Sequence, residues 1–309
     1  MGHDHLPLVS VVIAAYNKAE LTVRTIQSVL RQIYPRIEII VVDDGSTDDT
    51  AQRLSSLGDK ITYIHKKNGG ACSARNIGIR AAKGRYIGLL DCDDIYYPEK
   101  VAACVDFLEK NPDCGFVHTA AYFIDEQDSV ISRHTVPPEL RKEKIAELLL
   151  PDNFVCNSTV MARKSCFERV GFFDETIFMP ADWEMWMRLA MEYPCGYIDI
   201  PLTGYRLSSS YSMGNLEQGE REDSLVLERF LKQRSRLSLF RKNNIIARTY
   251  IRFGKRRGAT GDMVQARKWF LRAMVKNPLN GKLWLFTPWS FFFPEQAKAL
   301  LEKKVLWRS

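Results

Sequence analysis

The feature of this chain that most constrains its fold is a regular alternation between two hydrophobic periods over the first hundred residues. Short apolar runs, typical of strands buried on both faces, occupy residues 8–15, 37–42, 61–65 and 85–90. Between them, helix-type spacings occupy residues 18–32, 48–57 and 71–82. This alternation predicts βαβ units, and therefore an α/β domain with a mainly parallel sheet flanked by helices.

Polar residues follow three of these strands directly. Tyr16 and Asn17 follow the first, Asp43 and Asp44 follow the second, and the sequence D-C-D-D at residues 91–94 follows the fourth. Ligands bind at the carboxyl ends of the strands in such sheets, so these residues predict a binding site along one edge. The fingerprint G-x-G-x-x-G does not follow the first strand, which argues against an enzyme that uses NAD or FAD.

The acidic run at residues 91–94 has two interpretations. Hard oxygen ligands suit Mg²⁺ or Mn²⁺, and one or two carboxylates suffice when the phosphates of a bound diphosphate complete the coordination shell. Alternatively, the acids form a solvated turn in which Asp94 caps the helix expected after Pro98. The position of the run at the end of a buried strand favours the metal.

Two other stretches suit a nucleotide. In V-V-D-D-G-S-T-D-D-T, residues 41–50, the two carboxylates after the strand can accept from a pyrimidine N3–H or a ribose hydroxyl. In N-G-G-A-C-S-A-R-N, residues 68–76, a glycine loop precedes a helix start whose free N–H groups can meet phosphate oxygens. Arg75 lies one turn into that helix, where its guanidinium can bind a diphosphate or pair with an aspartate.

Composition and charge set the broader class. The 309 residues allow two domains, and the seven cysteines contain no C-x-x-C pair, which is typical of reduced cytosolic thiols. The longest uncharged runs have 12 residues, whereas a spanning helix needs about 20. The N-terminal residues lack the pattern of a signal peptide. We therefore expect a cytoplasmic protein without a transmembrane segment.

Charge is unevenly distributed along the chain. Residues 231–309 contain 19 Lys and Arg against 3 Asp and Glu, whereas residues 1–230 contain 25 against 34. This asymmetry and the helical composition beyond residue 215 predict an acidic domain at residues 1–215 and a basic helical tail at residues 216–309.

Four stretches together carry a family resemblance: VSVVIAAYN (9–17), VVDDGSTDDT (41–50), NGGACSARNIGI (68–79) and YIGLLDCDD (86–94). Their order and spacing, continued by GFFDE (171–175) and ADWEMWMRL (181–189), resemble the family 2 glycosyltransferases of GT-A fold over about residues 7–212. The resemblance implies a Rossmann-like catalytic domain. It also implies an inverting, metal-dependent transfer of a sugar from a nucleotide-diphosphate donor, which we expect to be UDP-linked. The acceptor would be a hydroxyl of a glycan or a lipid-linked glycan, in polysaccharide or cell-surface glycan synthesis.

The resemblance also implies roles for individual residues. The nucleotide-sugar would be bound by Ala14, Tyr16, Asp43, Asp44, Arg75, Asn76, Asp91 and Arg206. Among these, Tyr16 and Asp44 would contact the base and Asp43 would lie near the ribose. Asp93, supported by Asp91, would ligate Mn²⁺ or Mg²⁺. Asp182 falls where the family has its catalytic base, which would take the proton from the acceptor hydroxyl.

Asp182 has a structural alternative, because it also suits the N-cap of a helix expected at residues 183–191. Two positions depart from the family pattern. Many relatives have Glu where this chain has Ala181, and many have a histidine where this chain has Ser208. These departures leave Arg206 available for the diphosphate.

Two other functions stay open on the sequence. A sugar nucleotidyltransferase also uses an α/β nucleotide-binding domain with Mg²⁺, but that class opens with a Gly-rich loop bearing Arg or Lys, unlike A-A-Y-N-K-A-E at residues 14–20. A non-catalytic nucleotide-binding or scaffold module is compatible with the departures at Ala181 and Ser208.

The basic tail contains a smaller resemblance. Residues 250–280 are similar to one tetratricopeptide repeat, and because a single repeat cannot bury its own apolar face, we expect a helical hairpin. Beyond it, Trp and Phe flanked by lysines at residues 282–309 suit either aromatic anchors on an anionic membrane surface or the core of a helical tail. We expect peripheral contact with the inner face of a membrane. No nucleic-acid module accompanies the basic residues, so we expect no nucleic-acid partner.

Overall fold

The structure is a computed structural model that describes residues 5–140, 145–207, 216–235 and 237–280. Contacts within the chain divide it into two compact units. The first unit comprises Met1–Leu149 and Phe154–Ser212, and the second comprises Leu150–Asn153 and Met213–Ser309.

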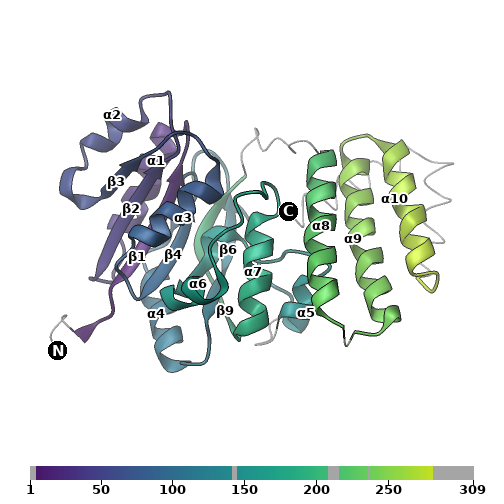
Figure 1. Cartoon of the computed structure of the whole chain (residues 1–309). Coiled ribbons are helices and arrows are strands. Elements are labelled where there is room, and N and C mark those ends of the chain that lie inside the picture. The colour runs from purple at the N-terminus through teal and green to yellow at the C-terminus, as the bar shows by residue number, and fades with distance from the viewer. Residues whose placement is uncertain (1–4, 141–144, 208–215, 236, 281–309) are drawn as a thin grey trace. The chain divides into compact units, whose positions relative to one another are not determined.

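The first unit is built on one mixed sheet (Figure 1). In the described part of the chain, nine strands join in the order β3-β2-β1-β4-β8-β6-β9-β5, and β7 pairs with β6 beside this path. The strands are β1 (Val9–Ala15), β2 (Ile37–Asp43), β3 (Thr62–His65), β4 (Tyr86–Asp91), β5 (Ile95–Tyr96), β6 (Phe116–Ile124), β7 (Val130–His134), β8 (Val160–Arg163) and β9 (Cys195–Arg206).

Strand direction changes after β4. The first four strands are parallel, as their alternation with helices predicts. Beyond them, β8 is antiparallel to both β4 and β6, β9 is parallel to β6, and β5 is antiparallel to β9. The predicted α/β class is therefore confirmed, with the parallel pairing concentrated in the half of the sheet that the first hundred residues form.

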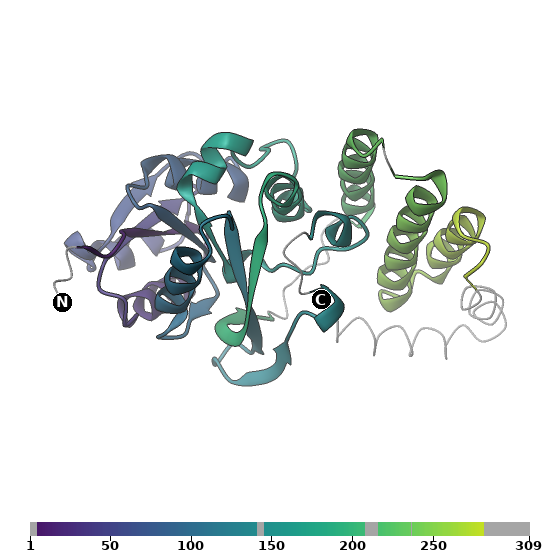
Figure 2. The same cartoon turned by 90° about the horizontal axis from the view of Figure 1, so that it is seen from below.

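Helices cover both faces of this sheet (Figures 1 and 2). They are α1 (Ala19–Leu30), α2 (Thr50–Ser55), α3 (Ala71–Ala81), α4 (Lys100–Lys110), α5 (Ala146–Leu149), α6 (Lys164–Val170) and α7 (Ala181–Glu192). Short 3-10 turns lie at Gly58–Lys60, Pro138–Leu140 and Asn157–Thr159.

The apolar runs of the strands explain this layering. Alternate residues of β1, including Val11 and Ile13, join one buried core with α1 and α4. On the opposite face, α3 lies directly on β1 and β2. The packing is so close that a side chain at Gly78 would collide with Val12 and come close to Val42. Packing this close holds α3, which carries Arg75, firmly on the sheet.

The second unit contains α8 (Leu216–Gln233), α9 (Leu239–Ala259) and α10 (Met263–Lys276). α9 and α10 form the helical hairpin that the sequence predicts, with Ala266, Phe270 and Ala273 in its buried core. Phe270 packs against Gly254, where any side chain would collide with its ring. Among the described helices, none is both long and apolar enough to span a bilayer.

Candidate active site

The parallel register of three strands brings the predicted polar strand ends together. Ala15 of β1 pairs with Asp43 of β2, and Ala14 pairs with Asp91 of β4. β1 therefore lies between β2 and β4. The chain adds β2 and β3 on one side of β1 and then β4 on its other side, so the strand order reverses at this point. Open α/β sheets bind ligands at such a point.

A cleft of about 500 Å³ opens at this edge. Seven of the predicted residues line it: Ala14, Tyr16, Asp44, Arg75, Asp91, Asp93 and Arg206. The side chain of Tyr16 is half exposed there. Three other predicted residues, Asp43, Asn76 and Asp182, are described in the structure but are not part of the lining.

The acidic run at the end of β4 separates into three different environments. Asp91 Oδ1 accepts from Arg75 Nη2 at 2.6 Å and from Asn157 Nδ2 at 2.8 Å. Asp93 Oδ2 accepts from Lys18 Nζ at 2.5 Å. Each of these two partly buried carboxylates therefore has its own cation, which reduces the repulsion between neighbouring acids.

Asp94 is buried and has a structural role that differs from the predicted one. The helix after Pro98 begins at Lys100, and its N-cap, Glu99, makes no side-chain capping bond, so the capping role expected for Asp94 is wrong. Asp94 instead accepts from Ser158 Oγ at 2.5 Å and from the backbone N–H of Arg206 at 2.8 Å. Burial, followed by repulsion from the neighbouring acids, raises the pKa of Asp94 well above its ordinary value.

Arg75 is held in place by its pair with Asp91. Its guanidinium lies 5.6 Å from the ring of Phe173 and is largely buried. Burial alone would lower the pKa of Arg75, but the ion pair with Asp91 outweighs it and raises this pKa above the ordinary value. Arg75 is therefore a fixed positive charge at the wall of the cleft.

Asp44 organises the glycine loop that precedes α3. Its Oδ1 accepts from Lys66 Nζ at 2.5 Å and from Gly69 N–H at 2.9 Å, and its Oδ2 accepts from Gly70 N–H at 2.7 Å. Gly70 has a φ of +89°, in the left-handed region that glycine favours. One carboxylate thus fixes the loop that brings Gly70 and Ala71 to the cleft.

Asp43 is not part of the cleft lining. Its carboxylate is fully buried and accepts from Ser46 N–H at 2.8 Å, from Tyr63 Oη–H at 2.6 Å and, at 3.3 Å, faces His65 Nδ1. Burial alone would raise the pKa of Asp43, but the hydrogen bonds from Ser46 and Tyr63 lower it overall. The ribose contact expected for Asp43 is therefore not supported by its position.

Asn76 and Arg206 also differ from expectation. The Asn76 amide is buried and exchanges two hydrogen bonds with the backbone of Phe173, at 2.8 and 2.9 Å. Arg206 lines the cleft, but each of its guanidinium nitrogens donates to the protein: to the carbonyls of Asp93 and Asp125 and to the carboxylate of Asp128. Both side chains hold loops together, so the expected contact of Arg206 with a diphosphate is not supported.

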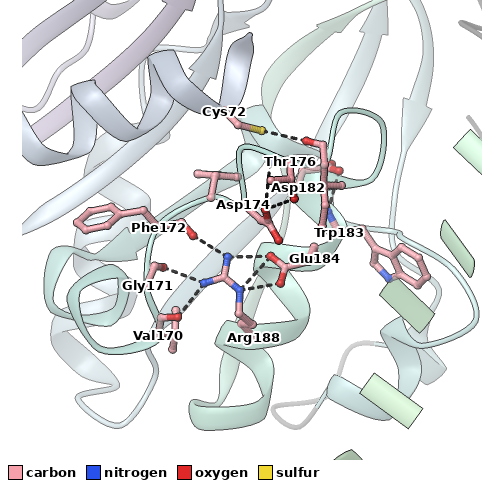
Figure 3. A network of polar contacts seen from close by, with 12 residues as sticks. Cys72, Val170, Gly171, Phe172, Asp174, Thr176, Asp182, Trp183, Glu184 and Arg188 are labelled. Atoms are coloured by element: carbon pink, nitrogen blue, oxygen red, sulfur yellow. Dashed lines mark hydrogen bonds and ion pairs between the residues drawn. The ribbon is translucent and has the colours of Figure 1, made fainter. Parts of the chain in front are cut away.

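Asp182 lies in the first turn of α7, which begins at Ala181. It is therefore not the N-cap that the alternative interpretation predicts; that position is Pro180. Its Oδ1 accepts from the N–H of Trp183 at 2.7 Å (Figure 3). Burial lowers the pKa of Arg75 and the pair with Asp91 raises it; the charge of Asp182 is a smaller cause of the same rise.

A single arginine fixes the start of α7. Arg188 donates to both carboxylate oxygens of Glu184 and to the carbonyls of Val170, Gly171 and Phe172, at 2.7–3.0 Å (Figure 3). The backbone ahead of Asp182 is held as well, since Cys72 Sγ donates to the carbonyl of Ile177 at 3.6 Å. These contacts fix the backbone on both sides of Asp182.

Sequence reasoning missed several residues of the site. Lys18 follows the motif Y-N directly, so its position was a usable signal. Asn157 and Ser158, which bind Asp91 and Asp94, belong to no recognisable motif, and the pairing of the following strand, β8, with β4 brings them to these acids. Ser208 lies outside the described residues, whereas Ala181 is buried.

The donor set at the end of β4 fits a divalent cation that is completed by a ligand. Asp91 Oδ2 and Asp93 Oδ1 receive no hydrogen bond from any described residue. Within the described ranges, no three His, Cys, Asp or Glu side chains are grouped so that they could hold a metal by themselves. Hard carboxylate oxygens suit Mg²⁺ or Mn²⁺, and a bound diphosphate can supply the missing ligands.

Comparison with known proteins identifies relatives of this chain. The family described as Glycosyl transferase family 2 matches residues 10–171. An uncharacterized glycosyltransferase of Rickettsia prowazekii (strain Madrid E) is 38% identical over 186 residues, covering 59% of this chain and 58% of that protein. The UDP-Glc:alpha-D-GlcNAc-diphosphoundecaprenol beta-1,3-glucosyltransferase WfaP of Escherichia coli is 32% identical, covering 60% of this chain and 70% of that protein. The chain thus spans less than two thirds of the Rickettsia protein.

Solved structures share the fold. The crystal structure of S. aureus TarS 1-349 in complex with UDP-GlcNAc matches with a TM-score of 0.67 and 16% identity, covering 96% of this chain and 91% of that chain. The mannosyltransferase PcManGT from Pyrobaculum calidifontis, in complex with GDP-Man and Mn²⁺, matches with a TM-score of 0.57 and 18% identity, covering 97% of this chain and 87% of that chain. The predicted GT-A fold is confirmed.

The buried hydrogen bonds of Asp43 predict a pH-dependent contribution to stability. Because its native pKa is depressed, Asp43 stabilises the fold above its unfolded pKa of about 3.9, and this contribution is lost as the pH falls through the native pKa. We expect Asp43→Asn to lower the free energy of unfolding by about 1–3 kcal/mol at pH 7, with a smaller difference from the wild type below pH ~4. Urea unfolding between pH 3 and 7 measures both.

The matched control for this change is Asp49→Asn. Asp49 is exposed and, among the described residues, its ion pair is with Arg53, four residues along, so the change should alter stability by less than about 1 kcal/mol. An Asp43→Asn protein as stable as the wild type at pH 7 would contradict the prediction.

Proposed function

The chain belongs to glycosyl transferase family 2, and on that basis we propose that it is a metal-dependent, inverting glycosyltransferase. The donor is a nucleotide-diphosphate sugar, which we take to be UDP-linked, and the acceptor is a hydroxyl of a glycan or a lipid-linked glycan. The observation that carries the proposal is the cleft at the carboxyl ends of β1, β2 and β4, where paired acids and cations face one opening. Two comparisons support a UDP-linked donor: the name of WfaP contains UDP-Glc, and the TarS structure is a complex with UDP-GlcNAc.

The donor side of the proposal uses the residues that line the cleft. Tyr16 offers a half-exposed aromatic ring beside Ala14, which suits contact with a nucleotide base. Asp44 acts on the donor through the Gly69–Gly70 loop that it fixes, and its remaining lone pairs can still accept from the base. Arg75 supplies a fixed positive charge for the diphosphate.

The metal of this proposal is Mn²⁺ or Mg²⁺, held by Asp93 with Asp91. Both acids keep one carboxylate oxygen that no described donor uses, and both lie on the cleft. The PcManGT complex contains Mn²⁺, which supports divalent metal use in this fold. When bound, the ion would act as a Lewis acid that stabilises negative charge on the departing diphosphate.

The proposed base is Asp182. An inverting displacement requires a carboxylate on the side of the sugar opposite the departing diphosphate. Asp182 belongs to a separate element, α7, and is outside the lining of the donor cleft, yet close enough to act electrostatically on Arg75. The contacts of Arg188 and Glu184 keep the start of α7 in place and so support this role.

Family membership weighs against a sugar nucleotidyltransferase as the alternative. The alternative of a non-catalytic nucleotide-binding or scaffold module rests on the departures at Ala181 and Ser208. Ser208 lies outside the described residues. The Ala181 side chain is buried, so an acid there would need a buried partner. The first proposal therefore accounts for more of the site.

Donor binding should stabilise the protein in a metal-dependent way. With Mn²⁺ and UDP at about 100 times its dissociation constant, we expect the free energy of unfolding to rise by about 2.7 kcal/mol. Thermal melts with UDP, GDP and their sugars measure this. EDTA and Asp93→Asn should each remove most of the shift, because both remove metal from the diphosphate. An equal shift in excess EDTA would contradict the metal requirement.

Removal of the proposed base should abolish transfer without abolishing donor binding. We expect Asp182→Asn to reduce the rate of sugar transfer by about 10²–10⁴-fold, with the Mn²⁺-dependent thermal shift by UDP retained. Glu192→Gln is the control, since Glu192 ends the same helix and is exposed. Transfer that survives Asp182→Asn would exclude this residue as the base.

We also propose that the second unit contacts an anionic membrane surface. On α10, Val264, Leu271 and Val275 lie on one exposed face, and the exposed Lys268 and Arg272 lie on and beside that face. An exposed helix face that combines apolar and basic residues is typical of helices that lie in the plane of a membrane. The aromatic segment at residues 283–294, to which the sequence assigns the same role, lies outside the described residues.

Vesicle binding tests this contact. We expect the protein to sediment with phosphatidylglycerol vesicles, to bind phosphatidylcholine vesicles less, and to be released as salt rises, because the basic side chains act electrostatically. Val275→Ser should weaken binding, whereas Val130→Ser, which changes an exposed valine of β7 in the first unit, should not. Binding that is indifferent to both salt and Val275→Ser would contradict the proposal.

A further inference from the structure

The ion pair between Lys18 and Asp93 joins two different parts of the site. Lys18 precedes α1 and lines the cleft, and its Nζ lies 2.5 Å from Asp93 Oδ2, beyond the end of β4. The family resemblance assigns no role to this lysine, yet it neutralises the acid that we propose as the metal ligand.

The backbone around Lys18 is fixed on both sides. The N–H and hydroxyl of Thr22 both donate to the Lys18 carbonyl at 2.8 Å, which anchors it to α1. Asn17 is held by Ser46 Oγ at 3.0 Å and by the N–H of Thr47 at 2.8 Å. Movement at Lys18 is therefore confined to its long, flexible side chain.

The Lys18 side chain has the freedom that Arg75 lacks. Lys18 is 39% exposed, and within the described residues its ammonium has one hydrogen-bond acceptor, Asp93. The Arg75 side chain is 13% exposed and packs on Phe173, and its partner Asp91 is also held by Asn157. Of these two pairs, that of Lys18 can dissociate without disturbing the core.

A divalent cation and the Lys18 ammonium compete for the same carboxylate. Two positive charges at one oxygen repel each other strongly in a partly buried site, so tight binding of both at Asp93 is unfavourable. The diphosphate of the donor offers a new partner in the same cleft. The negative charge of the diphosphate balances the positive charge of the metal. Lys18 can therefore move from Asp93 to a phosphate oxygen without a change in the net charge of the site.

We propose that Lys18 is an exchange residue, which neutralises Asp93 before ligands bind and transfers to a phosphate oxygen of the donor when metal and donor bind together. This inference rests on the metal and donor sites proposed above. Its consequence is a coupling between the two ligands. Metal alone must break the ion pair without compensation, whereas metal with a diphosphate gives Lys18 a new partner, so each ligand raises affinity for the other.

The test measures binding of Mn²⁺ and UDP to the full chain, separately and together. Electron paramagnetic resonance gives the dissociation constant of Mn²⁺ with and without UDP, and calorimetry gives that of UDP with and without Mn²⁺. We expect UDP to tighten Mn²⁺ binding to the wild type by at least about tenfold, within the usual range of coupling between sites. In Lys18→Met, Mn²⁺ alone should bind tighter, and UDP in the presence of Mn²⁺ should bind more weakly.

Three variants isolate the charge of Lys18. Lys18→Met keeps the length of the side chain and removes its charge, and circular dichroism should show an unchanged fold because the residue is partly exposed. Lys18→Arg keeps the charge and should keep weak binding of Mn²⁺ alone. Lys60→Met removes an exposed lysine from a surface turn outside the lining of the cleft and should change neither constant.

The possible results separate this inference from the proposed function. If the wild type binds Mn²⁺ and UDP through Asp93 but Lys18→Met binds both like the wild type, the exchange is wrong and the function stands. The exchange is also wrong if Lys18→Arg binds Mn²⁺ alone as tightly as Lys18→Met. If the wild type binds neither ligand, or if binding survives Asp93→Asn, both the function and the exchange are overturned.

Discussion

Repulsion among the carboxylates at the carboxyl edge of the sheet is the constraint around which the cleft is organised. β2 and β4 lead into five aspartates: Asp43, Asp44, Asp91, Asp93 and Asp94. Such a group is stable only if each carboxylate gains a cation, a set of hydrogen-bond donors or a proton. The protein uses the first two of these means. Asp93 pairs with a lysine, and Asp91 pairs with an arginine and an amide. Asp44 combines a lysine with backbone N–H groups, and Asp43 and Asp94 accept from buried donors.

This arrangement separates the acids by function. Asp43 and Asp94 are buried, and their hydrogen bonds hold neighbouring segments together, although Asp94 also borders the cleft. Asp91 and Asp93 remain on the cleft, each with one carboxylate oxygen that no described residue uses. Their cationic partners lie on the same cleft. The site therefore presents both signs of charge, which suits a ligand that combines a cation with a diphosphate.

Much of the fold was predictable because it depends on local patterns. Continuous Val- and Ile-rich runs specify strands buried on both faces, and the helices between them require parallel pairing. The second half of the sheet followed no such rule, because β8, β9 and β5 join it in mixed directions through long-range pairing. The contacts of Asn76 and Arg206 could not be predicted for the same reason. Their partners, Phe173 and Asp128, are 97 and 78 residues away along the chain.

The sequence by itself determined the family, the α/β class and the set of polar residues that end the parallel strands, because each depends on residue type, order and short-range spacing. Only the tertiary structure decided which of these residues face the cleft. That choice depends on which donors meet each side chain, and Lys18, Asn157 and Ser158 reach the acids from segments that no local pattern connects to them. An aspartate that is alone in the sequence has no fixed role, because its charge state and its freedom to bind a ligand are set by the partners that folding brings to it.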